Sequence, residues 1–177
     1  LILLTPWLVV DAQKDVKAIE ILEDVSKRVL SYKNISADFI FSMENKEMEL
    51  DEENEGSLKM NGKKYVVDLP GIGVKVFSDG QTIWNYMKDG NQVTISNSAD
   101  QDNELMDPAS IFTIYEKGFH PKLKGESKEA GKLCYQIELI PENQESDISK
   151  VIVNIDKTEM MINSALFQSK DGNLYGI

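Results

Sequence analysis

The residue types that most often carry catalysis are scarce in this sequence. It contains one histidine, His120, and one cysteine, Cys134, and it has no CxxC, HExxH or glycine-rich phosphate-loop pattern. A Ser-His-Asp or Cys-His arrangement would have to use His120, and nothing places Cys134 or a glycine-flanked serine beside it. The apolar neighbours of Cys134 in KLCYQIELI indicate a buried and unreactive thiol. The sequence therefore predicts a protein that is not an enzyme and that has no metal or cofactor.

Acidic residues are abundant, but they are not spaced for chemistry. The chain has 30 acidic and 19 basic residues, which gives a net charge of −11. This charge argues against nucleic-acid binding, because no basic stripe is present to neutralise phosphates, and against docking on an anionic bilayer. The acidic runs at 43–56 and 100–104 lack the ligand spacing of a calcium loop. We expect both runs to be solvated turns and strand edges.

Apolar side chains are the remaining candidates for a functional surface. Residues 76–96, VFSDGQTIWNYMKDGNQVTIS, contain two Asp-Gly pairs that favour tight type I′ hairpins. Such turns would set Ser78 opposite Gln81 and Trp84 opposite Ile95. One face of these hairpins carries Phe77, Trp84, Tyr86, Val93 and Ile95, and the other carries Val74, Val76, Ile83 and Met87. Two explanations fit: burial on both sides in a β-sandwich, or a curved sheet that packs a helix on part of its surface and binds an apolar guest on the rest.

Periodicity predicts one long helix followed by strands. Residues 14–34 have apolar positions at helical spacing, which predicts an amphipathic helix of about five turns. Alternation predicts strands at 35–43, 46–51, 55–60, 63–69, in the double hairpin, and at 120–126, 132–140, 149–155 and 160–169, with a last one after the Asp171-Gly172 turn. Asp107 as N-cap, Pro108 at the first helical position and Gly118 as the stop predict a short apolar helix among them. About ten antiparallel strands of this length normally curl or close.

The first ten residues, LILLTPWLVV, are the only membrane-like segment, and they are too short to span a bilayer. Val10 and Ala12 occupy the −3 and −1 places of a signal-peptidase site. We therefore expect residues 1–12 to be the remnant of a cleaved secretory signal and 13–177 to be a single domain, cut short at its C-terminal end. An N-terminal strand is the alternative, although Pro6 and the lack of alternation argue against it.

Four segments carry a resemblance to a known family. They read SYKNISADFIFSM, EGSLKMNGKKYVVDL, VFSDGQTIWNYMKDGNQV and DPASIFTIYEKGF, and SDGQTIWNY (78–86) is the most specific. From about residue 15 onward the chain resembles the periplasmic outer-membrane lipoprotein carrier proteins, the LolA family, in its more divergent branch. The resemblance implies a mainly β fold with α: an unclosed antiparallel β-barrel, or half-barrel, wrapped on a long N-terminal helix and covered by a short helical lid.

The function implied by the resemblance is transport through the periplasm. Such a carrier shields the acyl chains of lipoproteins in an apolar cavity, receives them from an inner-membrane ABC transporter and delivers them to an outer-membrane acceptor. The resemblance also implies a lid-latching arginine, but this chain has Gly62, Lys63 or Lys64 at that position, and lysine cannot reproduce a guanidinium fork. Two alternatives stay open: a lipid-sensing or interaction module of the same fold with no transfer role, and a closed lipocalin-like barrel.

The residues expected to form this site are apolar. We expect the acyl cavity to be lined by Phe39, Phe41, Met43, Leu58, Met60, Tyr65, Trp84, Tyr86, Val93 and Ile95. We expect the lid to consist of Pro108, Ile111, Phe112, Ile114 and Tyr115. We also expect the carrier to be a monomer.

Overall fold

The structure is a computed structural model that describes residues 15–98 and 118–177. The expected signal remnant at residues 1–12 lies outside the described residues. So do the five expected lid residues, Pro108, Ile111, Phe112, Ile114 and Tyr115. Both expectations therefore stay predictions.

One α-helix, α1 (Val16–Ser31), precedes the strands. Asp15 is its N-cap, and the Oδ1 atom of Asp15 accepts a hydrogen bond from the amide of Ala18 at 3.1 Å. The other carboxylate oxygen accepts from the amide of Leu123 at 2.9 Å, so one side chain both starts the helix and ties it to the C-terminal half of the chain. These amides hold the pKa of Asp15 below its ordinary value, with the Leu123 bond as the larger cause. An amphipathic helix is present as predicted, but it spans Val16–Ser31 rather than 14–34, and its buried residues are Ala18, Ile21, Leu22, Val25, Ser26 and Val29.

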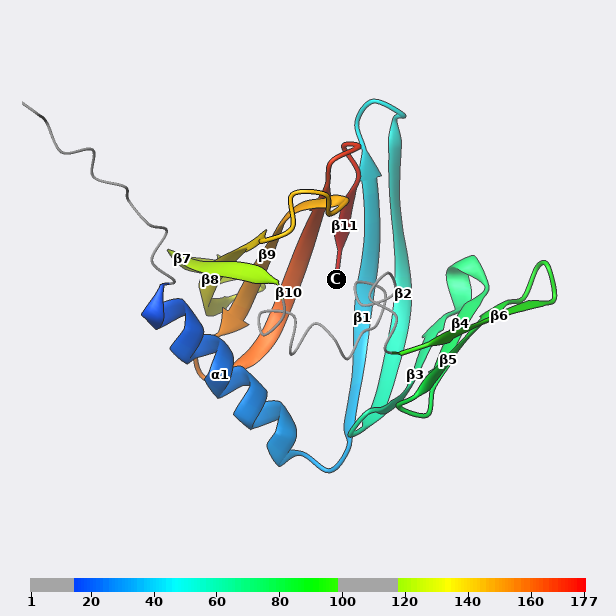
Figure 1. Cartoon of the computed structure of the whole chain (residues 1–177), viewed down its shortest axis with the longest axis horizontal. Helices are drawn as coiled ribbons and strands as arrows, with labels where there is room; N and C mark the ends of the chain where they lie inside the picture. The colour runs from blue at the N-terminus through cyan, green and yellow to red at the C-terminus, as the bar shows by residue number, and fades with distance from the viewer. Residues whose placement is uncertain (1–14, 99–117) are drawn as a thin grey trace, which may run out of the picture.

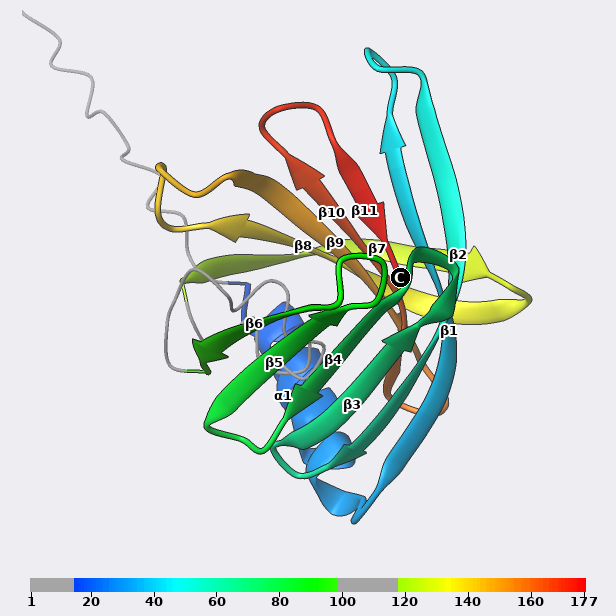
Figure 2. The same ribbon diagram turned by 90° about the vertical axis from the view of Figure 1, so that its right-hand side faces the viewer.

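The described strands form a single antiparallel sheet. They are β1 (Ile35–Asn45), β2 (Leu50–Asn61), β3 (Lys64–Leu69), β4 (Val74–Ser78), β5 (Thr82–Met87), β6 (Gln92–Asn97), β7 (Phe119–Glu129), β8 (Lys132–Pro141), β9 (Ile148–Asp156), β10 (Met161–Ser169) and β11 (Leu174–Gly176), with a 3-10 turn, η1 (Pro70–Ile72), between β3 and β4. Their order is β6-β5-β4-β3-β2-β1-β11-β10-β9-β8-β7, so β6 and β7 are free edges and the sheet is not closed. The sheet is bent, and α1 lies on its inner side (Figures 1 and 2). The predicted mainly β, unclosed antiparallel fold is confirmed.

The hydrophobic core joins α1 to both halves of the sheet. We call the face that meets α1 the inner face; it carries Leu58 paired with Val67 on one half, and Leu139 paired with Val151 on the other. These four side chains and the apolar stripe of α1 belong to one buried cluster. The opposite side of the sheet is the outer face. Because antiparallel partners project to the same side, the register assigns every strand residue to one of these two faces.

The predicted strand at 46–51 is wrong. Residues 46–49 form a turn, and β2 runs without a break from Leu50 to Asn61. The Oδ1 atom of Asn45 accepts hydrogen bonds from the amides of Glu47 and Met48, both at 3.0 Å, and Glu49 follows with a positive φ of 54°. A local side-chain turn of this kind replaces strand pairing in the middle of the acidic run.

The first Asp-Gly hairpin has a different register from the one predicted. Ser78 pairs with Ile83 rather than Gln81, because the Asp79 carboxylate accepts from the amides of Gln81 and Thr82, both at 2.8 Å, and centres the turn one residue later. Neither Asp79 nor Asp89 has the positive φ that a type I′ turn requires. The second hairpin keeps the predicted register, with Trp84 opposite Ile95. The shift in the first hairpin is two residues, so no side chain changes face.

Candidate functional site

The register divides the expected cavity residues between the two faces of the sheet. The inner face carries six of them: Phe39, Phe41, Met43, Leu58, Met60 and Tyr65. The outer face carries the other four, Trp84, Tyr86, Val93 and Ile95. The prediction that these four share a face with Phe77 is confirmed by the row Phe77, Trp84, Ile95. The ten residues therefore do not line a single surface.

The inner face has a buried zone next to α1. Leu58, Met60, Tyr65, Val67 and Ile83 are each less than a tenth exposed. All of them except Ile83 belong to the same buried cluster as the apolar stripe of α1, as the side chains of an ordinary core do. This zone anchors the N-terminal half of the sheet to α1.

Farther from the helix the inner face remains apolar but is only half buried. This half-buried zone consists of Phe39, Phe41, Met43, Leu69, Val76 and Tyr175. Sequence reasoning did not assign Leu69, Val76 or Tyr175 to the site. Alternation with Tyr65 placed Leu69 on the correct face, whereas the side to which Val76 points depends on the turn between β3 and β4.

Charges are nearly absent from the inner face of β1–β5. Register places only one charged side chain there, Glu52, which lies opposite Met43 near the far end of the hairpin. The polar residues between the apolar ones are Asn54, Ser78 and Asn85, and all three are neutral. A surface of this composition can remove apolar groups from water but offers nothing to bind an ion or transfer a proton.

Gly56 permits the closest packing in the half-buried zone. It pairs with Phe39 across β1 and β2, and the Phe39 ring occupies the space that a side chain at position 56 would need. A Cβ atom there would lie 2.5 Å from Cζ of Phe39 and 2.8 Å from Cδ2 of Leu69. The glycine therefore lets the aromatic ring lie over the backbone and touch the next strand.

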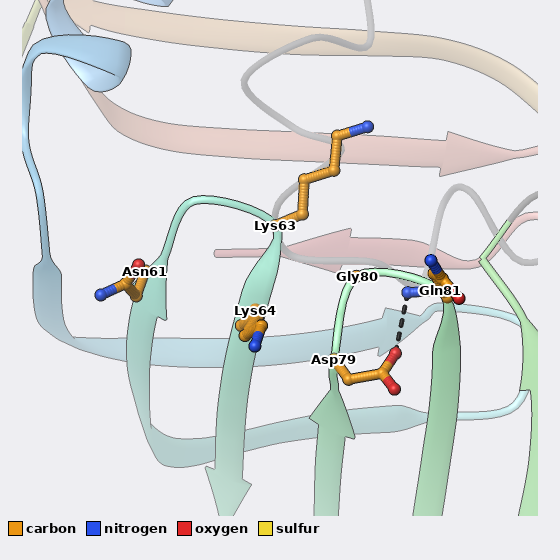
Figure 3. Close-up of a pocket in the computed structure, with 6 residues that line it drawn as sticks. All are labelled: Asn61, Lys63, Lys64, Asp79, Gly80 and Gln81. Atoms are coloured by element: carbon orange, nitrogen blue, oxygen red, sulfur yellow. Dashed lines mark hydrogen bonds between the residues drawn. The ribbon is translucent and has the colours of Figure 1, made fainter.

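A polar pocket lies at the ends of β2–β5, between two hairpin turns. Asn61, Lys63, Lys64, Asp79, Gly80 and Gln81 line it, as Figure 3 shows. The side chains of Lys63 and Lys64 point in different directions, and the Asp79 carboxylate is bound by the Gln81 amide. The amides of Thr82 and Gln81 lower the pKa of Asp79. This pocket is unsuited to acyl chains, and it contains both lysines that the family resemblance places near the latching arginine.

The described residues contain neither a metal cluster nor a membrane-spanning helix. Within residues 15–98 and 118–177, no group of three or more His, Cys, Asp or Glu side chains is placed to hold a metal ion. None of the helices in these ranges combines the length and the apolar character needed to cross a membrane.

Several solved structures share this fold. An uncharacterized conserved protein from Thermus thermophilus aligns with 91% of this chain and 84% of its own, with a TM-score of 0.55 and 17% identity. A putative outer membrane lipoprotein-sorting protein domain from Vibrio parahaemolyticus aligns with 90% of this chain and 74% of its own (TM-score 0.53, 14% identity). The Mycobacterium tuberculosis lipoprotein LppX aligns with 92% and 93% (TM-score 0.51, 10% identity). Identities this low establish the shared fold alone.

Comparison with sequence families is more specific than comparison with structures. No curated protein matches the chain. The family described as "Outer membrane lipoprotein carrier protein LolA" matches residues 9–169, which is most of the sequence. The match spans α1 and ten of the described strands, from β1 to β10. The chain therefore belongs to the LolA family of outer membrane lipoprotein carrier proteins.

Proposed function

We propose that this protein is a periplasmic carrier that shields the acyl chains of lipoproteins and moves them from the inner to the outer membrane. The observation that carries the proposal is the half-buried, nearly charge-free zone of the inner face, from Phe39 and Phe41 to Val76. An unclosed sheet leaves such a zone accessible from one side, whereas a solid core would bury it. Membership of the carrier family supports the same conclusion.

The energetics of acyl chains explain why partial shielding is useful. Burial of one methylene group contributes about 0.8 kcal/mol, so a long acyl chain left in water costs on the order of 10 kcal/mol. A soluble carrier must therefore cover its cargo throughout transit. A carrier that bound acyl chains as favourably as a bilayer does could not release them. A half-open apolar surface can both shield the chains during transit and release them.

The acyl-binding surface proposed here is narrower than the set of residues expected from sequence. It comprises the inner-face residues Phe39, Phe41, Met43, Leu69 and Val76, backed by the core around Leu58 and Met60. Trp84, Tyr86, Val93 and Ile95 are left out because they lie on the other side of the sheet. The lid role of residues 107–118 stays a prediction.

Two phenylalanines on opposite faces provide the test. Phe41 is half buried on the inner face, and Phe77 is 39% exposed on the outer face. Phe41→Ser should weaken the binding of an environment-sensitive apolar dye and of a diacylated lipopeptide by roughly 10- to 150-fold, since it removes roughly 1.5–3 kcal/mol of apolar contact. Phe77→Ser should leave both affinities unchanged. Circular dichroism and thermal midpoints would show that both variants are folded.

The lipopeptide also separates acyl binding from ordinary peptide binding. The same peptide without acyl chains should not displace the dye. Equal competition by the unacylated peptide, or equal losses in the two phenylalanine variants, would show that the inner face is not an acyl site.

The transfer role needs its own assay. We expect the protein to release lipoproteins from membranes that contain the inner-membrane ABC transporter, in an ATP-dependent step, and to pass them to an outer-membrane acceptor. Tight acyl binding without release or delivery would instead indicate a lipid-sensing module of the same fold.

A further inference from the structure

The outer face of β4–β6 carries a continuous apolar patch, which the acyl-binding proposal does not use. Phe77, Trp84 and Ile95 form one row across the three strands, and Tyr86 and Val93 form the next. Ile95 is 65% exposed, Val93 51% and Phe77 39%. We call these five residues the outer aromatic patch. Figure 2 shows β3–β6 nearest to the viewer with α1 behind them, so the helix does not cover this face.

Acidic residues are scarce in the segment that carries the outer aromatic patch, in contrast to the rest of the chain. Residues 57–98 contain five lysines and three acidic residues: Lys59, Lys63, Lys64, Lys75 and Lys88, with Asp68, Asp79 and Asp89. This segment is slightly positive, although the whole chain has a net charge of −11. The net negative charge of the chain therefore comes from residues outside this segment.

Register places the lysines beside the aromatic rows. Lys59 lies opposite Val66, in the row that continues through Phe77 to Ile95. Lys64 lies on the same outer face opposite Asn61. Lys75 is opposite Tyr86 and is paired with Asp68 at 2.7 Å. Exposed ammonium groups thus border the apolar rows on the same face.

Most acidic residues of the β1–β2 hairpin follow Met43 and continue to Glu55, toward the loop end of the hairpin. The exception is Asp38, which lies on the outer face opposite Ser57, in the row that continues through Asp68 and Lys75. In both views the loop end projects away from β3–β6 (Figures 1 and 2). Since the Debye length at physiological salt is about 8 Å, distant charges contribute little to the potential at the outer aromatic patch.

We propose that the outer face of β3–β6 docks on an anionic lipid bilayer. Tryptophan and tyrosine favour the membrane–water interface, where an apolar ring and a polar edge are both accommodated, and neighbouring lysines are attracted to anionic headgroups. The negative net charge disfavours the docking of other faces and so selects this orientation. The proposal goes beyond acyl binding, since it concerns the opposite side of the sheet.

The test uses residues 1–177 and two matched sets of lysine substitutions. The first is Lys59→Gln/Lys64→Gln, on the outer face, and the second, Lys128→Gln/Lys150→Gln, changes the net charge equally but in β7 and β9. Both sets keep residues 1–12, so any contribution of that apolar segment is the same in each. Binding is measured by cosedimentation with vesicles of phosphatidylethanolamine and phosphatidylglycerol, and with vesicles of phosphatidylcholine.

The first set should weaken binding to the phosphatidylglycerol vesicles by about fivefold for each lysine, and the second set should have a much smaller effect. Added salt should weaken binding of the unmodified protein, and phosphatidylcholine vesicles should bind poorly. In a Trp7→Phe background, brominated lipid should quench Trp84 fluorescence. Dye binding without vesicles should be unchanged in both sets, which separates this proposal from the acyl site.

Equal losses in the two lysine sets, or a Trp84 signal that brominated lipid does not quench, would overturn the proposal. Binding that is the same on both kinds of vesicle would also overturn it. The outer aromatic patch would then be assigned to a protein partner.

Discussion

Gly56 offers the sharpest test of how the half-buried zone is packed. In Gly56→Ala the new Cβ atom would lie 2.5 and 2.6 Å from two Phe39 ring atoms, whereas ordinary contact begins near 3.4 Å. The ring therefore has to move by nearly an ångström or leave its position. Overpacking of this kind destabilises the folded state by about 1–3 kcal/mol. The alanine also reduces the conformational entropy of the unfolded chain, which stabilises the protein by about 0.4–1 kcal/mol. We expect a net loss of about 1–2 kcal/mol in the free energy of unfolding.

The double variant Gly56→Ala/Phe39→Ala isolates the contact. Once the ring is gone, the remaining close neighbour is the flexible end of Leu69, so the alanine at position 56 should be neutral or slightly stabilising in that background. Urea denaturation of the four proteins gives a coupling free energy, which we expect to exceed about 1 kcal/mol. Each kcal/mol should appear as a shift of about 2–4 °C in the thermal midpoint.

Gly90→Ala is the matched control for this cycle. Gly90 also has no positive φ, and the nearest atom to a Cβ there would be 3.8 Å away, so this substitution should cost nothing. A Gly56→Ala protein as stable as wild type would refute the reasoning. The reasoning would also be refuted if Gly56→Ala lowered the free energy of unfolding by the same amount in the Phe39→Ala background.

Other predictions concern the helix cap, the buried thiol and Asn154, a buried polar residue of β9. Asp15→Asn should lower stability at neutral pH by about 1–2 kcal/mol. Folding lowers the pKa of Asp15, so its carboxylate contributes its full stabilisation above pH 3.8, the ordinary pKa, and loses it as the pH falls through the lower pKa of the folded protein. Urea denaturation should therefore show a stability difference between the two proteins at neutral pH that disappears at strongly acidic pH. Cys134 is fully buried and burial raises its pKa, so a thiol reagent should label it only in denaturant, and rapid labelling of native protein would contradict the structure. Asn154 is 5% exposed and donates to Glu129 at 2.6 Å, so Asn154→Leu should cost about 1–3 kcal/mol in chemical denaturation, while a neutral result would show that Glu129 finds another partner.

The sequence predicted those features that depend on local periodicity. Helical spacing identified α1, and alternation assigned Trp84 and Ile95 to one face and Ile83 to the other. These predictions succeeded because the side-chain period of a strand is fixed by the backbone and does not require knowledge of its partners. The predicted burial of Cys134 is also confirmed, although its partners on the adjacent strands are the polar residues Ser127 and Asp156.

The sequence could not predict which side chains of β4–β6 point to the same side of the sheet as those of β1–β3, because that depends on the connection between β3 and β4. Residues 70–73 separate Leu69 from Val74, and η1 followed by Gly73, with φ of 64°, lets these two residues pair directly. The even number of connecting residues puts Val74 and Val76 on the same side as Leu69 and sends Phe77 and Trp84 to the opposite side. One residue more or less in this turn would reverse that assignment, and the Pro70-Gly71 pair alone marks only a break.

The position of β11 has a consequence for the order of folding. Strands β1–β6 pair with their sequence neighbours, as do β7–β10, whereas β11 joins the two groups by pairing with both β1 and β10. The contact between Ser42 and Gly176 closes a loop of roughly 130 residues, which costs about 2 kcal/mol more entropy than closing a hairpin of about ten residues. The two groups, β1–β6 and β7–β10, are antiparallel meanders that should therefore assemble early and independently. The pairing between β1 and β11 should form last, together with the packing of α1 against the two meanders. Native-state amide exchange should show the same division, with each meander opening as a unit and the seam at β11 as the boundary between them.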